Sequence, residues 1–380
     1  MPLEPPVNRS INQMFHIRYI VKDRFIILLL GALLVGWMPI AGGKEVASLA
    51  PAQIDFGFDY EKSSIHASNH VEQKLETKNY RVRSLSFPSL GENGQRGNLV
   101  KALYYQSKRP GKKKLVIVLP IWGTSTYPSR KITKSLLRYS RGDINVLRIL
   151  GEDFLFDWAA MRAAASEAAL IAVAERMVER VRTHVRDVRR AIDWAEAQPG
   201  VDADRIGLIG FSMGAIVGSL IAANEPRIAA TVLAMGGANT HEMLATCFGR
   251  AKEAREAIMA RLGWTKETFE EKLERPLMPI NAARFAGSVN PDRVIIFEAE
   301  RDTCIPKSSR DALWHAMGRP QRISWPYNHK MAFLMMSPLG SNTMPRKIYA
   351  FLEDTLRHPP APLKTQLAGR DPRLEAESLR

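Results

Sequence analysis

The chain has 380 residues, 46% of them hydrophobic and 24% charged, and a formal net charge of +15 at pH 7. This length and apolar content allow one large globular domain with an ample core, and two cysteines are too few for a disulfide framework. Residues 101–141 contain eleven Lys or Arg and no acidic residue, which indicates either a solvated basic face or an anionic partner such as a lipid or polysaccharide surface. Nucleic acid is not expected as a partner, because no zinc-finger, RNP or helix-turn-helix pattern is present.

The first 43 residues have the pattern of an export or anchoring segment. Four basic residues precede an apolar, charge-free run from Ile26 to Met38, and small residues follow at 41–43. This pattern is typical of a signal peptide, although the run is nearly long enough to span as an uncleaved membrane anchor. Both interpretations place the body of the protein across the cytoplasmic membrane, in the periplasm or another extracytoplasmic space. Residues 44–77 are expected to form a polar connector.

From residue 78 to residue 358, short apolar runs alternate with helical patterns. Eight runs predict strands, at 81–87, 99–106, 115–121, 144–150, 206–211, 229–235, 294–299 and 322–325. Helices are predicted at 129–140, 160–197, 213–224, 308–317 and 344–357. This alternation predicts an α/β fold, with a mostly parallel eight-stranded sheet covered by helices on both faces. The first two strands follow each other closely, and we expect them to form an antiparallel edge.

Three segments need a separate interpretation. Residues 160–197 are rich in alanine and arginine and contain no glycine or proline, and we expect an exposed crossover helix there. Residues 239–287 show helical pattern and no clear strand. They predict a helical cap inserted after the sixth strand, above the carboxyl edge of the sheet. Residues 359–380 are expected to form a polar C-terminal tail.

The most informative stretch is the Gly-x-Ser-x-Gly motif at Gly210, Ser212 and Gly214. A short apolar run precedes it, and small and apolar residues at helical spacing follow it. This context predicts a sharp turn between a strand and a helix, on which the serine hydroxyl stands clear of the chain. The two glycines are needed where a side chain would collide with the crowded strand and helix.

Partners for Ser212 are sought at the ends of later strands, because catalytic groups of an open parallel sheet gather at its carboxyl edge. Asp302 comes just after the strand at 294–299, and His329 follows the strand at 322–325. The other histidines beyond Asp302 lie in or at the end of predicted helices. A serine, an acid and a histidine therefore follow three strands in the chain order Ser, Asp, His, which favours a catalytic triad.

With these motifs, residues 80–358 resemble the α/β-hydrolase superfamily and, within it, the dienelactone-hydrolase-like and related esterase branch. Besides the elbow and the loops of Asp302 and His329, the segment from Leu119 to Gly123 resembles the oxyanion loop of that family. The chain departs from the family pattern in two places. The common His-Gly pair after the third strand is absent, and Ala215 stands where a second glycine often follows the elbow.

The resemblance implies acyl transfer through Ser212, with His329 as base and Asp302 orienting the base. The backbone N–H of Met213 and that of Ile121 or Trp122 would bind the oxyanion. An apolar pocket for a small ester is expected at Phe211 and Trp122. No metal and no organic cofactor is required.

Three functions are compatible with these residues. The favoured one is a serine hydrolase that cleaves carboxylic esters or thioesters through an acyl-enzyme on Ser212. An acyltransferase would use the same acyl-enzyme with an alcohol acceptor, and a non-catalytic binding protein would keep only the fold. The sequence leaves open whether Cys247 and Cys304 pair, and it leaves the oligomeric state open as well.

Overall fold

The structure is a computed structural model that describes residues 57–358, apart from 63–64, 66, 72–74, 91–98, 122–125, 152–154 and 286. All described residues belong to one compact unit, Ile54–Arg380. The export segment predicted at 1–43 and the tail predicted at 359–380 lie outside the described residues. None of the described helices combines the length and the apolar character that a membrane crossing requires.

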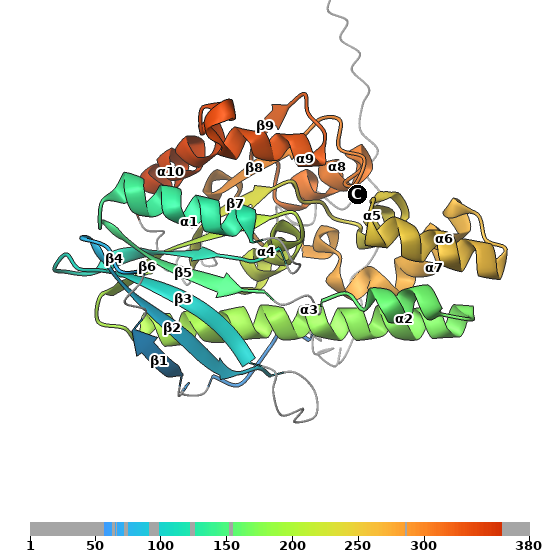
Figure 1. Cartoon of the computed structure of the whole chain (residues 1–380), viewed down its shortest axis with the longest axis horizontal. Helices are drawn as coiled ribbons and strands as arrows, with labels where there is room; N and C mark the ends of the chain where they lie inside the picture. Colours follow the sequence, from blue (N-terminus) through green and yellow to red (C-terminus); the bar gives the residue numbers. More distant parts are fainter. Residues whose placement is uncertain are drawn as a thin grey trace, which may run out of the picture. The chain divides into compact units, whose positions relative to one another are not determined.

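A nine-stranded sheet forms the centre of the unit, in the order β1-β2-β3-β5-β4-β6-β7-β8-β9 (Figure 1). Its strands are β1 (Ser68–Val71), β2 (Tyr80–Pro88), β3 (Leu99–Ser107), β4 (Lys113–Val118), β5 (Ile144–Leu150), β6 (Val201–Phe211), β7 (Ile228–Ala234), β8 (Val294–Ala299) and β9 (Gln321–Trp325). β1, β2 and β3 form an antiparallel edge, and the strands from β4 to β9 are parallel. The mostly parallel sheet and its antiparallel edge are confirmed, with one strand more than predicted.

The additional strand β1 lies inside the segment predicted as a polar connector. Another part of that segment is also packed on the domain, since Phe58 is buried and the Tyr60 hydroxyl donates a hydrogen bond of 2.7 Å to Asp193. The Arg189 guanidinium lies 4.9 Å from the centre of the Tyr60 ring. The connector prediction was therefore wrong for these residues, because their attachment depends on partners far away in the sequence.

Helices cover both faces of the sheet (Figure 1). The cores show that α1 (Tyr127–Ser140) and α10 (Thr343–Thr355) pack on one face, and that α3 (Glu167–Glu196), α4 (Met213–Asn224) and α8 (Lys307–Ala316) pack on the other. Shorter elements are α2 (Trp158–Ala163), α9 (His329–Ala332), η5 (Pro291–Arg293), η6 (Phe333–Met336) and η7 (Pro338–Gly340).

Side chains of the central strands alternate between two cores. Leu115 and Ile117 of β4 belong to the core beneath α3 and α4, whereas Val116 and Val118 belong to the core beneath α1 and α10. Because successive side chains of a strand point to opposite faces, a strand covered on both sides is apolar throughout. The parallel strands thus form a rigid platform whose carboxyl edge carries the loops described below.

The helix predicted at 160–197 is two helices, and most of it is buried. α2 ends at Ala163 and α3 begins at Glu167. Sixteen of the thirty residues of α3 are buried, including Arg190, which pairs with Asp187 at 3.5 Å. The prediction of an exposed crossover helix was wrong, because the arginines of α3 include side chains that pair with acidic groups within the protein.

His184, in the middle of α3, makes the stability of the protein sensitive to acid. Burial, assisted by the charge of Arg180, lowers the pKa of His184 to about 3. In the unfolded chain the His184 imidazole takes up a proton as the pH falls below about 6.5, whereas in the folded chain it stays neutral until about pH 3. The folded state therefore loses stability as the pH falls from 6.5 toward 3. From pH 7 to pH 5 this group should lower the free energy of unfolding by about 2 kcal/mol. Guanidinium unfolding at both pH values should show this loss in the wild type, and a loss smaller by that amount in His184→Gln. Equal losses in the two proteins would contradict the assignment.

The predicted helical cap is present between β7 and β8. It consists of α5 (Thr240–Thr246), α6 (Arg250–Leu262) and α7 (Lys266–Leu277), followed by η3 (Met278–Ile280) and η4 (Ala282–Phe285). Most of its large apolar side chains form an interior, as expected, among them Met243, Leu244, Ile258, Phe269 and Leu273. α6 packs on α2, and α7 packs on α3 and α5. The cap is thus supported by helices outside the sheet and extends from its carboxyl edge (Figure 1).

Candidate active site

The turn between β6 and α4 holds Ser212 in a left-handed conformation, with φ of 51° and ψ of −119°. Non-glycine residues rarely adopt such backbone angles, and they persist where the surrounding structure enforces them. Here the Ser212 N–H donates a hydrogen bond of 2.8 Å to the Ala234 carbonyl of β7. An added side chain at Gly210 would collide with the Gly214 carbonyl, as the motif predicts. The serine therefore stands at the tip of a strained elbow.

The structure brings Ser212, His329 and Asp302 together from three strand ends. The Ser212 hydroxyl lies 3.1 Å from Nε2 of His329, and Nδ1 of His329 lies 2.6 Å from Oδ2 of Asp302. His329 and Asp302 are buried, whereas Ser212 is partly exposed. Asn328 is the N-cap of α9, and its side chain accepts a hydrogen bond of 2.9 Å from Met331 N–H, which fixes the loop that carries His329. The arrangement is that of a nucleophile, a base and an orienting acid.

The loop after β8 wraps around the carboxylate of Asp302. Its Oδ1 accepts hydrogen bonds of 2.9 Å from the N–H groups of Cys304 and Ile305, which leaves Oδ2 for His329. A carboxylate that accepts several backbone hydrogen bonds is held in one orientation.

Arg310 of α8 occupies the inside of this loop, and the sequence did not identify it. Its buried guanidinium donates to the carbonyl oxygens of Ile305 (2.8 Å), Glu300 (3.2 Å) and Asp302 (3.4 Å). Nε of Arg310 also forms an ion pair of 3.5 Å with the buried carboxylate of Glu298. An arginine eight residues after the acid gives no signal in a single sequence, because its role depends on how α8 folds back under the loop.

The loop after β4 passes directly against the first turn of α4. An added side chain at Gly214 would collide with the Pro120 carbonyl, so this glycine allows the close approach. Ile121 follows and is partly exposed. Met213 is the first residue of α4, and the N–H groups in the first turn of a helix have no acceptor within it. Trp122, the other predicted oxyanion residue, lies outside the described residues.

Phe211 does not line an open pocket, and this prediction was wrong. Its side chain is fully buried in the core beneath α1 and α10, where its ring lies 6.3 Å from that of Phe333. As the last residue of β6 it points to one face of the sheet, whereas the turn lifts Ser212 above the edge. Partly exposed apolar side chains near the elbow are those of Met213 and Ile121.

The cap reaches the site through the residues between α5 and α6. Cys247 and Cys304 form a disulfide, which joins the cap to the acid loop two residues from Asp302. The next residue, Phe248, lies edge to face on His329, with ring centroids 6.1 Å apart and an interplanar angle of 70°. Phe248 is 38% exposed and is therefore not part of the interior of the cap.

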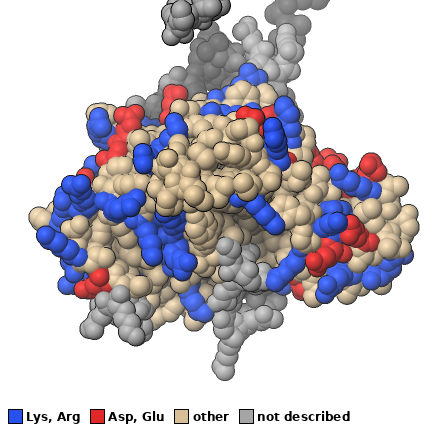
Figure 2. Space-filling view, turned by 45° about the horizontal axis from the view of Figure 1, so that its top comes forward, with Lys and Arg blue, Asp and Glu red and all other residues tan. Residues whose placement is uncertain are grey.

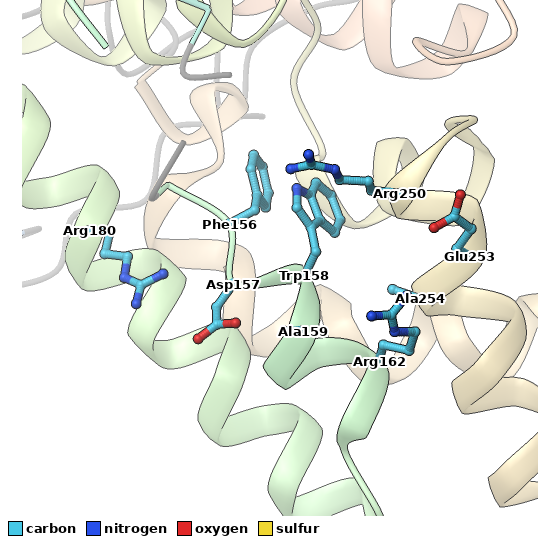
Figure 3. Close-up of a pocket in the computed structure, with 9 residues that line it drawn as sticks. All are labelled: Phe156, Asp157, Trp158, Ala159, Arg162, Arg180, Arg250, Glu253 and Ala254. Atoms are coloured by element: carbon cyan, nitrogen blue, oxygen red, sulfur yellow. The ribbon is translucent and has the colours of Figure 1, made fainter. Parts of the chain in front are cut away.

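A cavity of about 480 Å³ lies farther along the cap, between the loop before α2, α2, α3 and α6 (Figure 3). Stacked rings of Phe156 and Trp158, 4.7 Å apart, line it together with charged side chains. Those charged residues are Asp157, Arg162, Arg180, Arg250 and Glu253. None of the residues predicted for the site lines this cavity.

The basic stretch at 101–141 has exposed and buried members, and one face of the molecule carries more Lys and Arg than Asp and Glu (Figure 2). Arg130, Lys134 and Arg138 of α1 are exposed. Lys114 is instead buried and pairs with Glu353 at 2.9 Å. The stretch thus divides between a solvated basic face and structural ion pairs. Among the described residues, no three His, Cys, Asp or Glu side chains are grouped so as to hold a metal ion.

Comparison with known families gives one match that covers most of the domain. Residues 100–334 match the model of the dienelactone hydrolase family. Among curated proteins, an uncharacterized protein of Mycobacterium tuberculosis (strain H37Rv) is 27% identical over 146 residues. That alignment covers 38% of this chain and 32% of the relative, so the chain matches only about a third of the relative's length.

Solved structures share the fold at low sequence identity. An acetyl xylan esterase from Paenibacillus sp. R4 is 16% identical with a TM-score of 0.54, over 76% of this chain and 89% of that chain. Acetyl xylan esterase 1 from Thermoanaerobacterium sp. JW/SL YS485 is 18% identical with a TM-score of 0.53, over 77% and 89% of the two chains. The predicted α/β-hydrolase fold is confirmed.

Proposed function

Because the chain belongs to the dienelactone hydrolase family and is a hydrolytic enzyme of esterase type, we propose that it cleaves carboxylic esters or thioesters through an acyl-enzyme on Ser212. The single observation that carries this proposal is the hydrogen-bonded chain from the Ser212 hydroxyl through His329 to Asp302, on a strained elbow. Such a chain activates a hydroxyl that is a weak nucleophile on its own.

The proposed mechanism assigns one group to each step. His329 Nε2 accepts the proton of Ser212 as the hydroxyl attacks the acyl carbonyl, and Asp302 stabilises the imidazolium. The N–H of Met213, with that of Ile121 or Trp122, receives the oxyanion, and one such donor contributes about 3 kcal/mol. His329 then gives its proton to the leaving oxygen, and water hydrolyses the acyl-enzyme by the reverse proton transfers. The partly exposed Met213 and Ile121 favour a modest apolar acyl group.

Rapid mixing with p-nitrophenyl acetate and butyrate tests the proposal. Release of p-nitrophenol should show a burst with an amplitude close to the enzyme concentration whenever deacylation limits turnover, and acylated protein should appear in the intact mass. A folded protein that neither turns over these esters nor becomes acylated would contradict the proposal.

Arg310 should act as a positioning residue for Asp302. Arg310→Lys keeps the charge but loses the planar fork that reaches several carbonyls at once. We expect kcat to fall about tenfold with KM within about twofold, and stability to fall by about 2 kcal/mol. Arg322→Lys is the matched control, because Arg322 binds the same Glu298 at 2.8 Å and also Asp311 at 2.7 Å, and both of these partners lie outside the acid loop. Equal losses of kcat in both variants would show that the effect is only structural.

We also propose that the protein is exported and that its domain functions beyond the cytoplasmic membrane, attached to it if the N-terminal segment is retained. The apolar run at 26–38 and its basic flank support this orientation. The disulfide between Cys247 and Cys304 adds support, because such bonds persist in oxidising compartments. A C-terminal alkaline phosphatase fusion should be active in cells. A fusion that is produced in full length but inactive would refute the proposed export.

A further inference from the structure

The base His329 lies between two aromatic rings that differ in their surroundings. The Phe333 ring lies on the core side of His329, and the centroids of the two rings are 6.0 Å apart. Phe333 also packs near Phe211 there. Phe248 of the cap contacts His329 at 6.1 Å and is 38% exposed. Phe333 is only partly exposed, so Phe248 offers the larger surface to a molecule that enters from solvent.

The mechanism of acyl transfer indicates which part of an ester substrate lies next to Phe248. When the tetrahedral intermediate collapses, the bond between the carbonyl carbon and the leaving oxygen breaks, and that oxygen takes the proton held by Nε2 of His329. The leaving oxygen must then lie within about 3 Å of Nε2. A side chain that lies against the His329 ring and reaches solvent consequently borders the alcohol part of the ester, and the acyl part lies toward the oxyanion donors.

The cap holds Phe248 in this position through the acid loop. Cys247 is bonded covalently to Cys304, and the Thr246 hydroxyl donates a hydrogen bond of 3.1 Å to the Cys304 carbonyl. The Cys304 N–H binds Asp302, so the residues before Phe248 share their anchor with the acid that orients His329. Across the Phe248 ring, the Lys330 ammonium lies 4.6 Å from its centre.

On the basis of the proposed function, we propose that Phe248 forms the wall of the leaving-group site, that it favours esters of apolar ring-bearing alcohols, and that the Cys247–Cys304 disulfide keeps it there. The apolar ring offers contact area to an aromatic or cyclic alcohol that a methyl or ethyl group cannot use. Contact of this kind changes the ratio between two alcohols and leaves the preference among acyl groups unchanged.

The test compares benzyl acetate with ethyl acetate, and ethyl acetate with ethyl butanoate. In Phe248→Ala, kcat/KM for benzyl acetate should fall about fivefold to tenfold relative to ethyl acetate, while the acyl preference stays within about twofold. Tyr327→Ala is the matched control, since Tyr327 is a similarly exposed aromatic residue of the base loop and should leave both ratios unchanged. An unchanged benzyl-to-ethyl ratio in Phe248→Ala, or a changed acyl preference, would overturn the assignment.

A second arm tests the disulfide. The double variant Cys247→Ser/Cys304→Ser should lose the benzyl preference as Phe248→Ala does, and adding Phe248→Ala to it should cause no further loss. Reduction of the folded wild type with a phosphine gives the same comparison if the double variant does not fold. Independent, additive losses would overturn the role of the disulfide.

Labelling of Ser212 by a fluorophosphonate is followed in every variant. Absent labelling refutes the proposed function, whereas normal labelling with unchanged ratios refutes only the leaving-group wall.

Discussion

Replacement of Ser212 by alanine is expected to lower kcat for a small ester by a factor on the order of 10⁴ or more, since the nucleophile of the acyl-enzyme is lost. The melting temperature should stay within a few degrees of the wild type, because Ser212 is partly exposed and its turn is held by backbone hydrogen bonds. Steady-state kinetics and circular dichroism check both expectations.

Ser219→Ala, on the helix that follows Ser212, is a matched control. The Ser219 hydroxyl is buried and donates a hydrogen bond of 2.7 Å to the Ile216 carbonyl, so its loss should cost about 1 kcal/mol of stability and leave kcat unchanged. Turnover retained in Ser212→Ala would move the nucleophile to another residue.

Asp302→Asn is expected to lower kcat by about 10⁴, as tautomer reversal does in serine proteases. The asparagine oxygen still accepts the two backbone N–H groups of the acid loop, so the loop keeps its shape. Its amide then faces Nδ1 of His329 as a donor, and this moves the ring proton to Nε2, where it prevents acceptance of the serine proton. Kinetics at neutral pH measures the loss. The exposed Glu300 provides the control, because Glu300→Gln should change kcat by less than about twofold. A loss below about tenfold in Asp302→Asn would assign the orienting role to another acid.

The sequence predicted the parts of the molecule that depend on local pattern. Gly210, Ser212 and Gly214 were identified because a strand, a sharp turn and a helix follow one another without interruption. Asp302 and His329 were placed by the rule that functional loops follow the carboxyl ends of parallel strands, and the structure brings both to Ser212. The cap was indicated by a long interruption of the strand and helix alternation.

Features that depend on contacts between distant residues were missed or wrong. The pairing of Cys247 with Cys304 spans 57 positions and was left open. Arg310 is positioned by the return of α8 beneath the acid loop, for which the sequence carries no periodic signal. Phe211 was assigned to a pocket because it directly precedes Ser212 in the sequence. Adjacent residues at the end of a strand nevertheless point in different directions, and Phe211 points into the core.

Reaction with a fluorophosphonate, followed by peptide mass spectrometry, tests the nucleophilic role of Ser212 most directly. One adduct per chain is expected, on Ser212 within the tryptic peptide from Ile206 to Arg227. The adduct should be absent in Ser212→Ala and form far more slowly in His329→Ala, because the hydroxyl needs its base. An adduct on another residue, or a folded wild-type protein that remains unlabelled, would contradict the assignment of Ser212 as the nucleophile.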